Sequence, residues 1–257
     1  MSLIRIWAVA TNGFREVMRD RIFFVIAFYT LIMFAGWRIL PEISGASQEK
    51  IIADLGAATA SILGVVVAIF VGTGLINKEI EKRTVFVLVT KPVTSAEFII
   101  GKHLGLSAVL GILVAGMTGI YLTILSLAHV EYQLTSILIM AFFLLLELCL
   151  ITAAALLFGV FTSSILATLL TFTLYLVGHL SESMVKLSGV TKNPGFQKLT
   201  DNLYLVLPDL SRLDLKNTAV YGVLPAMDTL AMNAGYAVIY TAALLMITTV
   251  VFSRREF

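Results

Sequence analysis

Residues 134–161 read LTSILIMAFFLLLELCLITAAALLFGVF. Their only charged side chain is Glu147, and the apolar residues follow one another without alternation. A membrane-spanning helix needs about 20 mostly apolar residues, whereas a strand of a membrane barrel alternates apolar and polar residues over about 10. Because a backbone in lipid must satisfy its own hydrogen bonds, we expect this stretch to be a membrane-spanning helix.

The composition of the whole chain predicts the same class. Of the 257 residues, 59% are hydrophobic and 13% are charged, against roughly 45–50% apolar and about 25% charged residues in a soluble domain. This much apolar surface excludes an ordinary soluble globule and a disordered chain. One cysteine excludes a disulfide framework and a cysteine-based metal cluster. The remaining class is a polytopic membrane protein.

Six stretches are apolar and long enough to be spans, and they are predicted at residues 22–40, 55–76, 104–128, 134–161, 165–180 and 234–252. The fourth and fifth are separated only by Thr162, Ser163 and Ser164, which predicts a tight hairpin of two helices. Residues 1–21 carry apolar side chains at helical spacing and no signal-peptide pattern, so we expect an amphipathic helix in the membrane interface. The predicted fold is all-α, one transmembrane domain over residues 1–257.

The basic residues predict the orientation. Eleven of the 18 Lys and Arg residues lie before the first span, between the second and third spans, or after the sixth span. Positive charge favours the cytoplasmic side, so both termini are predicted to be cytoplasmic. Residues 181–233 then form an external loop, whose apolar spacing from Phe196 to Leu207 predicts an amphipathic helix that dips into the membrane. A gate, a docking site for an external partner and a plain surface loop are the open interpretations of this loop.

The connection between the second and third spans, residues 77–102, reads NKEIEKRTVFVLVTKPVTSAEFIIGK. The second span is expected to continue as a helix through its charged start, and a short amphipathic segment should follow and stop at Pro92. Thr94 and Glu97 have the spacing of a capping box, which starts the next helix. The pattern predicts a rigid cytoplasmic region over residues 77–103.

This connection closely resembles the cytoplasmic loop between the second and third spans of ABC-2 type transporter permeases. The residues that carry the resemblance are Glu79, Glu81, Thr84, Leu88, Pro92, Glu97, Phe98, Gly101 and Lys102. Phe14-Arg15-Glu16 and the ending Phe252-Ser253-Arg254-Arg255-Glu256-Phe257 are also similar to the family, so the resemblance covers essentially the whole chain. One departure is Ser95-Ala96, where relatives often carry Arg or an aromatic residue.

The resemblance implies a transport subunit rather than an enzyme. Such permeases sit in a prokaryotic inner membrane as half-transporters. Two copies or paralogues form a dimer in the lipid, and each docks a separate ATP-binding subunit that holds ATP and Mg²⁺. The sequence agrees, because it contains no G-x-x-x-x-G-K-[ST] motif for a triphosphate. We therefore expect export of cargo, no cofactor on this chain and no nucleic-acid partner.

The resemblance also gives a docking surface for the ATP-binding subunit, the coupling region of residues 77–102. The residues expected to form it are Glu79, Glu81, Lys82, Arg83, Thr84, Phe86, Leu88, Lys91 and Pro92. The alternative interpretation is a solvated loop whose charges only set the topology.

Glu147 is a second candidate, because it is predicted near mid-bilayer. A charge there costs about 2.5–3.5 kcal/mol on the insertion scale, so an intramembrane carboxylate is a functional candidate by default. It is expected to line a translocation path, to contact a second copy, or to hydrogen-bond a neighbouring helix and stabilise packing. Two other functions stay open: an ion-coupled secondary transporter, for which only Glu147 gives evidence, and a non-transporting anchor that couples an ATPase to an external protein. His103, His129 and His179 are predicted at different helix ends, which does not indicate a metal site.

Overall fold

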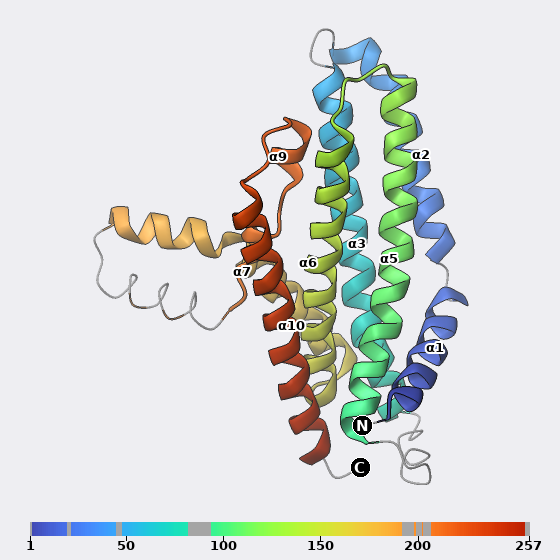
Figure 1. Cartoon of the computed structure of the whole chain (residues 1–257), viewed down its shortest axis with the longest axis vertical. Coiled ribbons are helices and arrows are strands. Elements are labelled where there is room, and N and C mark those ends of the chain that lie inside the picture. Colours follow the sequence, from blue (N-terminus) through green and yellow to red (C-terminus); the bar gives the residue numbers. More distant parts are fainter. Residues whose placement is uncertain are drawn as a thin grey trace.

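The structure is a computed structural model that describes residues 2–19, 22–44, 48–81, 94–191, 198, 202 and 207–254. These residues contain no strand. The six long helices are α2 (Ile22–Ser44), α3 (Gln48–Glu81), α5 (Ser95–Leu127), α6 (Leu134–Phe161), α7 (Ser164–Thr191) and α10 (Met227–Arg254). Each of them contains a stretch long and apolar enough to cross a membrane. The predicted all-α fold with six spanning helices is therefore confirmed (Figure 1).

The helices extend beyond the stretches that hydropathy marks. α5 begins at Ser95, as the predicted capping box requires and ahead of the predicted span start at 104, while α7 continues to Thr191 rather than 180 and α10 begins at Met227 rather than 234. The difference is physical, because an apolar stretch marks the part of a helix that suits lipid, while the backbone hydrogen bonds continue into the polar ends. The predicted hairpin is confirmed: only Thr162 and Ser163 separate α6 from α7. The assignment of the two ends to the cytoplasm and the exterior stays a prediction.

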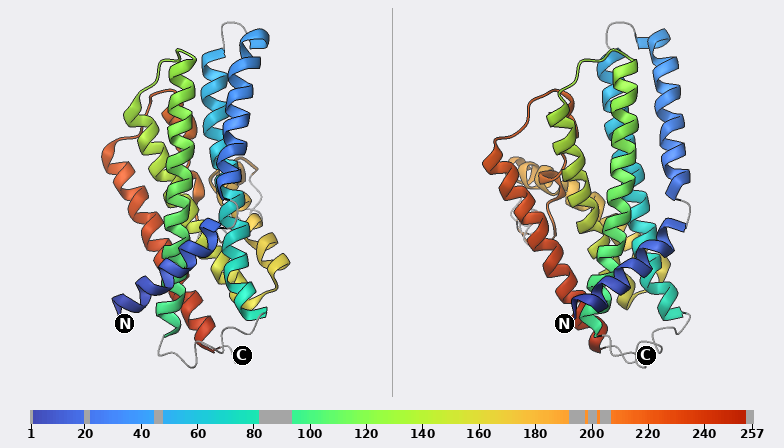
Figure 2. Two further views of the ribbon diagram at one scale, coloured as in Figure 1. Left: turned by 90° about the vertical axis from the view of Figure 1, so that its right-hand side faces the viewer. Right: turned by 45° about the vertical axis from the view of Figure 1, so that its right-hand side comes forward.

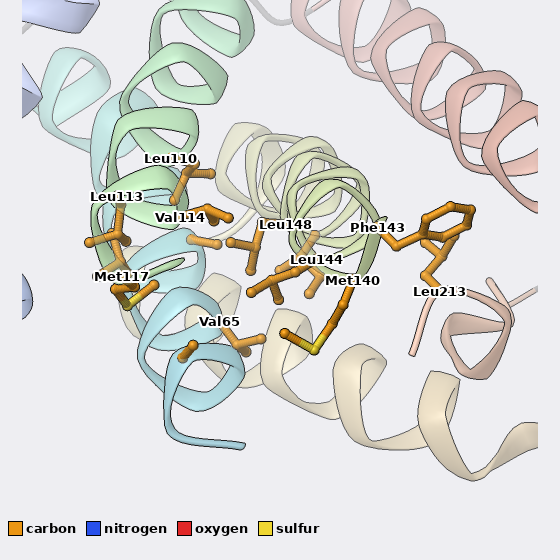
Figure 3. Close-up of a cluster of buried hydrophobic side chains, with 14 of the residues drawn as sticks. Val65, Leu110, Leu113, Val114, Met117, Met140, Phe143, Leu144, Leu148 and Leu213 are labelled. Atoms are coloured by element: carbon orange, nitrogen blue, oxygen red, sulfur yellow. The ribbon is translucent and has the colours of Figure 1, made fainter. Parts of the chain in front are cut away.

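α6 lies at the centre of the bundle and packs against α3, α5 and α10 (Figures 1 and 2). Its side chains from Leu148 to Leu156 include several that are fully buried. Figure 3 shows Leu144 and Leu148 of α6 facing Val65 of α3 and Val114 of α5 across one apolar cluster. This interior is filled by aliphatic side chains, as close packing between membrane helices requires.

The outer faces of the bundle are also apolar. Phe24 of α2 is 73% exposed, Ile165 of α7 is 78% exposed and Ile239 of α10 is 72% exposed. Soluble monomers rarely expose apolar patches of this kind over whole helices. The chain is therefore a multi-pass membrane protein whose outer surface suits lipid or a membrane-embedded partner.

The N-terminal helix α1 (Leu3–Arg19) lies obliquely across the end of the bundle where α5 begins (Figure 2). Its buried residues are Ile6, Ala10, Gly13 and Val17, whereas Leu3, Ile4 and Trp7 are exposed. Part of the apolar face that was predicted to contact lipid therefore packs against the bundle, and the rest is exposed. Its location in the interface stays a prediction.

Two glycines of α5 allow the close crossing of α1. A Cβ atom at Gly105 would lie 2.5 Å from the Ala10 carbonyl oxygen and 3.1 Å from the Phe14 amide nitrogen, and one at Gly101 would lie 3.0 Å from the Ile6 carbonyl oxygen. Backbone atoms cannot move aside as flexible side chains do. Only glycine therefore permits this approach of the two helices.

We predict that Gly105→Ala displaces α1 from α5 and destabilises the protein by about 1–3 kcal/mol, the range for overpacking. The measurements are the thermal midpoint in detergent and the rate at which a protease cleaves within α1. The matched control is Gly119→Ala in the same helix, where an added Cβ atom meets nothing within 4 Å. Equal effects of the two substitutions would contradict the interpretation.

Candidate functional site

The expected docking surface starts at the end of α3. Glu79 and Glu81 belong to its last turn, while Lys82, Arg83, Thr84, Phe86, Leu88, Lys91 and Pro92 lie outside the described residues. The structure thus places the two ends of this connection, at Glu81 and at Ser95. The contacts of the docking residues with a partner stay a prediction.

The predicted capping box at the start of α5 is present. Thr94 has an extended backbone and accepts a hydrogen bond from the Glu97 amide at 3.3 Å, and the Thr94 amide donates to Glu97 Oε2 at 3.0 Å. These reciprocal bonds satisfy amide groups that the first turn of a helix leaves without partners. The helix after the coupling region therefore starts at a fixed residue.

Glu97 also holds the N-terminus of α1. Its side chain is buried, Oε1 accepts a hydrogen bond of 2.6 Å from the Ser2 amide, and the Arg5 guanidinium lies 3.9 Å from Oε2. A carboxylate is stabilised at a helix N-terminus, where the backbone N–H groups point toward it. One buried carboxylate therefore caps two helices, α1 and α5, and joins them.

A second polar contact joins the same helices. Lys102 of α5 is 1% exposed, and its Nζ lies 3.3 Å from Glu16 Oε2 of α1 and 5.8 Å from the centre of the Phe98 ring. Phe98 in turn stacks on Phe252 of α10 with the ring centres 5.5 Å apart. The first turns of α5 are therefore tied to α1 by charge and to the end of α10 by aromatic packing.

Glu147 lies in a polar junction inside the bundle, which we define as Ser61 of α3, Glu147 of α6, His179 of α7, Asp214 and Lys216. His179 Nε2 lies 3.5 Å from Glu147 Oε1 and 3.8 Å from Asp214 Oδ2. Lys216 Nζ lies 3.2 Å from Asp214 Oδ2 and donates to Ser61 Oγ at 3.1 Å. The junction therefore connects three spanning helices with the segment that precedes α10.

That segment, residues 207–220, packs into the bundle. It contains a short 3-10 helix (Leu210–Arg212) and α9 (Lys216–Val220), and its buried apolar side chains are Leu210, Leu213, Leu215 and Ala219. Leu213 lies beside Phe143 of α6 (Figure 3). Leu210 and Leu213 are thus part of the core, while most of the helix predicted from Phe196 to Leu207 lies outside the described residues.

Asp209 anchors the start of this segment. Its buried carboxylate accepts hydrogen bonds from Ser211 Oγ at 2.6 Å and Arg212 Nε at 3.0 Å, and its amide donates to the Tyr236 hydroxyl of α10 at 2.8 Å. At Gly178 of α7 a Cβ atom would lie 2.9 Å from the Pro208 carbonyl oxygen. The segment therefore docks at a defined position against α7 and α10.

Sequence reasoning identified Glu147 and missed its neighbours. His179 was expected at a helix end apart from other ligands, and Asp214 and Lys216 belong to a stretch that was expected to be external. The available signal was the alternation of Leu213, Asp214, Leu215 and Lys216, which indicates a segment with one buried face.

A bundle of six spanning helices, with a fixed helix start after the connection from α3 to α5, is the architecture that the resemblance predicts. Residues 7–257 match the family model described as "ABC-2 family transporter protein". The chain belongs to the ABC-2 transporter family. It is thus a member of a family of membrane transport subunits. A comparison with curated protein sequences gives no match.

We predict that Glu97→Ala loosens α1, because the Ser2 and Thr94 amides lose their acceptor. Amide hydrogen exchange over residues 2–10, measured by mass spectrometry in nanodiscs, should become severalfold faster while exchange in α6 is unchanged. Glu131→Ala, at an exposed turn before α6, is the matched control and should change neither. Unchanged exchange of α1 in Glu97→Ala would show that another contact holds this helix.

We predict that Tyr236→Phe weakens the docking of residues 207–220 against the bundle, because the Asp209 amide loses its acceptor. A lost hydrogen bond of this kind costs about 0.5–1.5 kcal/mol. Amide exchange within 207–220 should rise accordingly, with α3 and α5 unaffected. If the exchange of this segment stays at the wild-type rate, Tyr236 does not contribute to its docking.

Proposed function

We propose that this ABC-2 protein is the permease half of an ABC transporter and that it exports cargo with energy from ATP. A separate ATP-binding subunit holds ATP and Mg²⁺ and docks on residues 77–103. The observation that carries this proposal is the family match over residues 7–257, and the structure supports it through the two helix ends at Glu81 and Ser95, between which the docking residues from Lys82 to Pro92 lie in the sequence.

The helices on both sides of the coupling region are suited to transmit movement. α3 and α5 are continuous helices that run between the two ends of the bundle (Figure 1). A displacement applied to the connection between Glu81 and Ser95 would move α3 and α5 directly, because these helices end and begin there. Through Glu97, Lys102 and Phe98 it also reaches α1 and α10. Closure of an ATP-binding subunit would therefore move four helices from one point of contact.

The partners follow from the same proposal. The exposed apolar faces of α2, α7 and α10 are available to lipid and to a second permease, a copy or a paralogue, in a dimer. The basic residues favour an orientation with both termini in the cytoplasm, and the family resemblance implies a prokaryotic inner membrane. The loop predicted over residues 181–233 would then lie on the external side, with an external partner as one proposed role beside the packing of segment 207–220 into the bundle.

Two alternatives differ from this proposal in measurable ways. An ion-coupled transporter is supported only by the intramembrane junction around Glu147, and it requires no ATP-binding subunit. A non-transporting anchor binds that subunit but moves no cargo. Co-purification of an ATPase separates the first alternative from the proposal, and reconstituted movement of cargo separates the second.

We predict that the double substitution Glu79→Lys and Glu81→Lys abolishes docking, because it reverses two charges at the start of the coupling region. The tagged chain is purified from the membranes of its own cells, and the co-purified ATPase activity is measured together with the mass-spectrometric signal of a subunit carrying G-x-x-x-x-G-K-[ST]. Glu131→Lys, a charge reversal at an exposed turn elsewhere, should leave both unchanged. Equal recovery of the ATPase with the double variant would overturn the docking assignment.

A further inference from the structure

Two buried polar atoms of the polar junction face each other. Glu147 Oε1 and His179 Nε2 are 3.5 Å apart, and neither makes a hydrogen bond within the part of the chain that the structure describes. The Glu147 side chain is 2% exposed. A buried polar atom without a partner is costly, so two such atoms at this distance require a hydrogen between them.

The other ring nitrogen of His179 decides where that hydrogen comes from. His179 Nδ1 lies 3.3 Å from the Tyr175 carbonyl oxygen, which only accepts, so Nδ1 carries a hydrogen. In a neutral imidazole Nε2 is then a bare acceptor, and it faces a carboxylate oxygen that is also an acceptor unless Glu147 is protonated. Either Glu147 donates to neutral His179 or protonated His179 donates to the Glu147 carboxylate. Both forms hold one proton between the two residues.

The charged groups around Glu147 and His179 determine the net charge of the junction. Segment 207–220 presents Asp209, Asp214 and Lys216, α7 presents Tyr175 next to His179, and α3 presents Ser61. Asp214 and Lys216 neutralise each other at 3.2 Å, and Asp209 is neutralised by Arg212 at 3.0 Å. The junction is therefore neutral when Glu147 and His179 share one proton, and it carries an uncompensated negative charge when that proton is lost.

Segment 207–220 is the part that closes this site. A cavity of about 10 Å³, enough for roughly one water, lies beside Glu147 and is lined by Leu213, Asp214, Leu215 and Lys216. When the segment is seated, Glu147 is shielded from water. When it leaves, both members of the pair remain on α6 and α7 and meet water.

We infer that Glu147 and His179 form a proton-binding site inside the bundle and that its one shared proton keeps segment 207–220 docked. Loss of the proton leaves a buried carboxylate against a bare ring nitrogen and Asp214, and this repulsion releases the segment. The inference concerns the permease chain alone and does not depend on the ATP-binding subunit, so either proposal can fail without the other.

The direction of the pH dependence follows from proton counts. In water, Glu and His side chains have pKa values of about 4.3 and about 6.5. The undocked pair therefore holds no proton above about pH 6.5 and one between these values, while the docked pair holds one. Because the docked state then binds one proton more, the docked-to-undocked ratio falls by up to about tenfold per pH unit above about pH 6.5. It is level between about pH 4.3 and 6.5.

The test is amide hydrogen exchange of residues 207–220 in the full chain in nanodiscs from pH 6.5 to pH 9. Rates are corrected for the intrinsic pH dependence of exchange, and peptides of α5 and α6 report whether the bundle is folded. We expect protection of the segment in the wild-type chain to fall with rising pH by up to about tenfold per unit. Protection that is level over this range would overturn the inference.

Substitutions distinguish the effect of the shared proton on docking from the effect of side-chain packing. In Glu147→Gln the amide donates to neutral His179 Nε2 without a titratable proton, so protection should be level with pH. In His179→Gln the docked state still needs the Glu147 proton, while the undocked carboxyl loses it above about pH 4.3, so the fall of protection with rising pH should begin below pH 6.5. Glu147→Leu removes the titratable carboxyl, should also give protection that is level with pH, and decides the question if Glu147→Gln unfolds α5 and α6. Glu131→Gln should keep the wild-type dependence of protection on pH. Tyr236→Phe should lower the protection of residues 207–220 at every pH but leave its dependence on pH unchanged. A wild-type slope of protection against pH retained in both Glu147→Gln and Glu147→Leu would overturn the site.

Discussion

The hydrocarbon of a membrane offers no water to a peptide group, and the structure of this ABC-2 protein follows from that constraint. Each spanning segment satisfies its backbone as a helix, which is why six long helices account for most of the described chain. The same constraint acts on side chains. A polar group within the bundle persists only where another polar group meets it, so the few that occur mark the places where the helices are tied together.

Among these polar contacts, two groups of charged side chains join several elements each. At the end of the bundle where α5 begins, Glu97 and Lys102 join α1 to α5. They follow directly after the connection that is proposed to receive the ATP-binding subunit. Within the bundle, the junction around Glu147 ties α3, α6 and α7 to segment 207–220. Between them lies close-packed aliphatic interior, centred on α6. Because such an interior has little freedom to deform, a displacement of α5 under the proposed coupling would move the neighbouring helices as units.

Much of the architecture could be predicted because hydropathy and capping are local. The spans were predicted from runs of apolar residues, the hairpin from the three polar residues Thr162 to Ser164, and the start of α5 from Thr94 and Glu97. The end of α7 and the start of α10 were less predictable, because these helices continue through polar residues. The family could be recognised from the same local patterns, and the match over residues 7–257 agrees with it.

The sequence by itself determined the class of fold, the number of spanning helices, the family and the presence of one carboxylate at mid-span. Only the tertiary structure decided what that carboxylate meets. His179 is 32 positions away from Glu147, and Asp214 and Lys216 belong to the predicted external loop, after the amphipathic helix predicted from Phe196 to Leu207. Which side chains meet depends on how segment 207–220 seats against α7 and α10 at Gly178 and Tyr236. Burial of that segment is a property of the packed bundle, because local hydropathy does not specify which helix faces will enclose it.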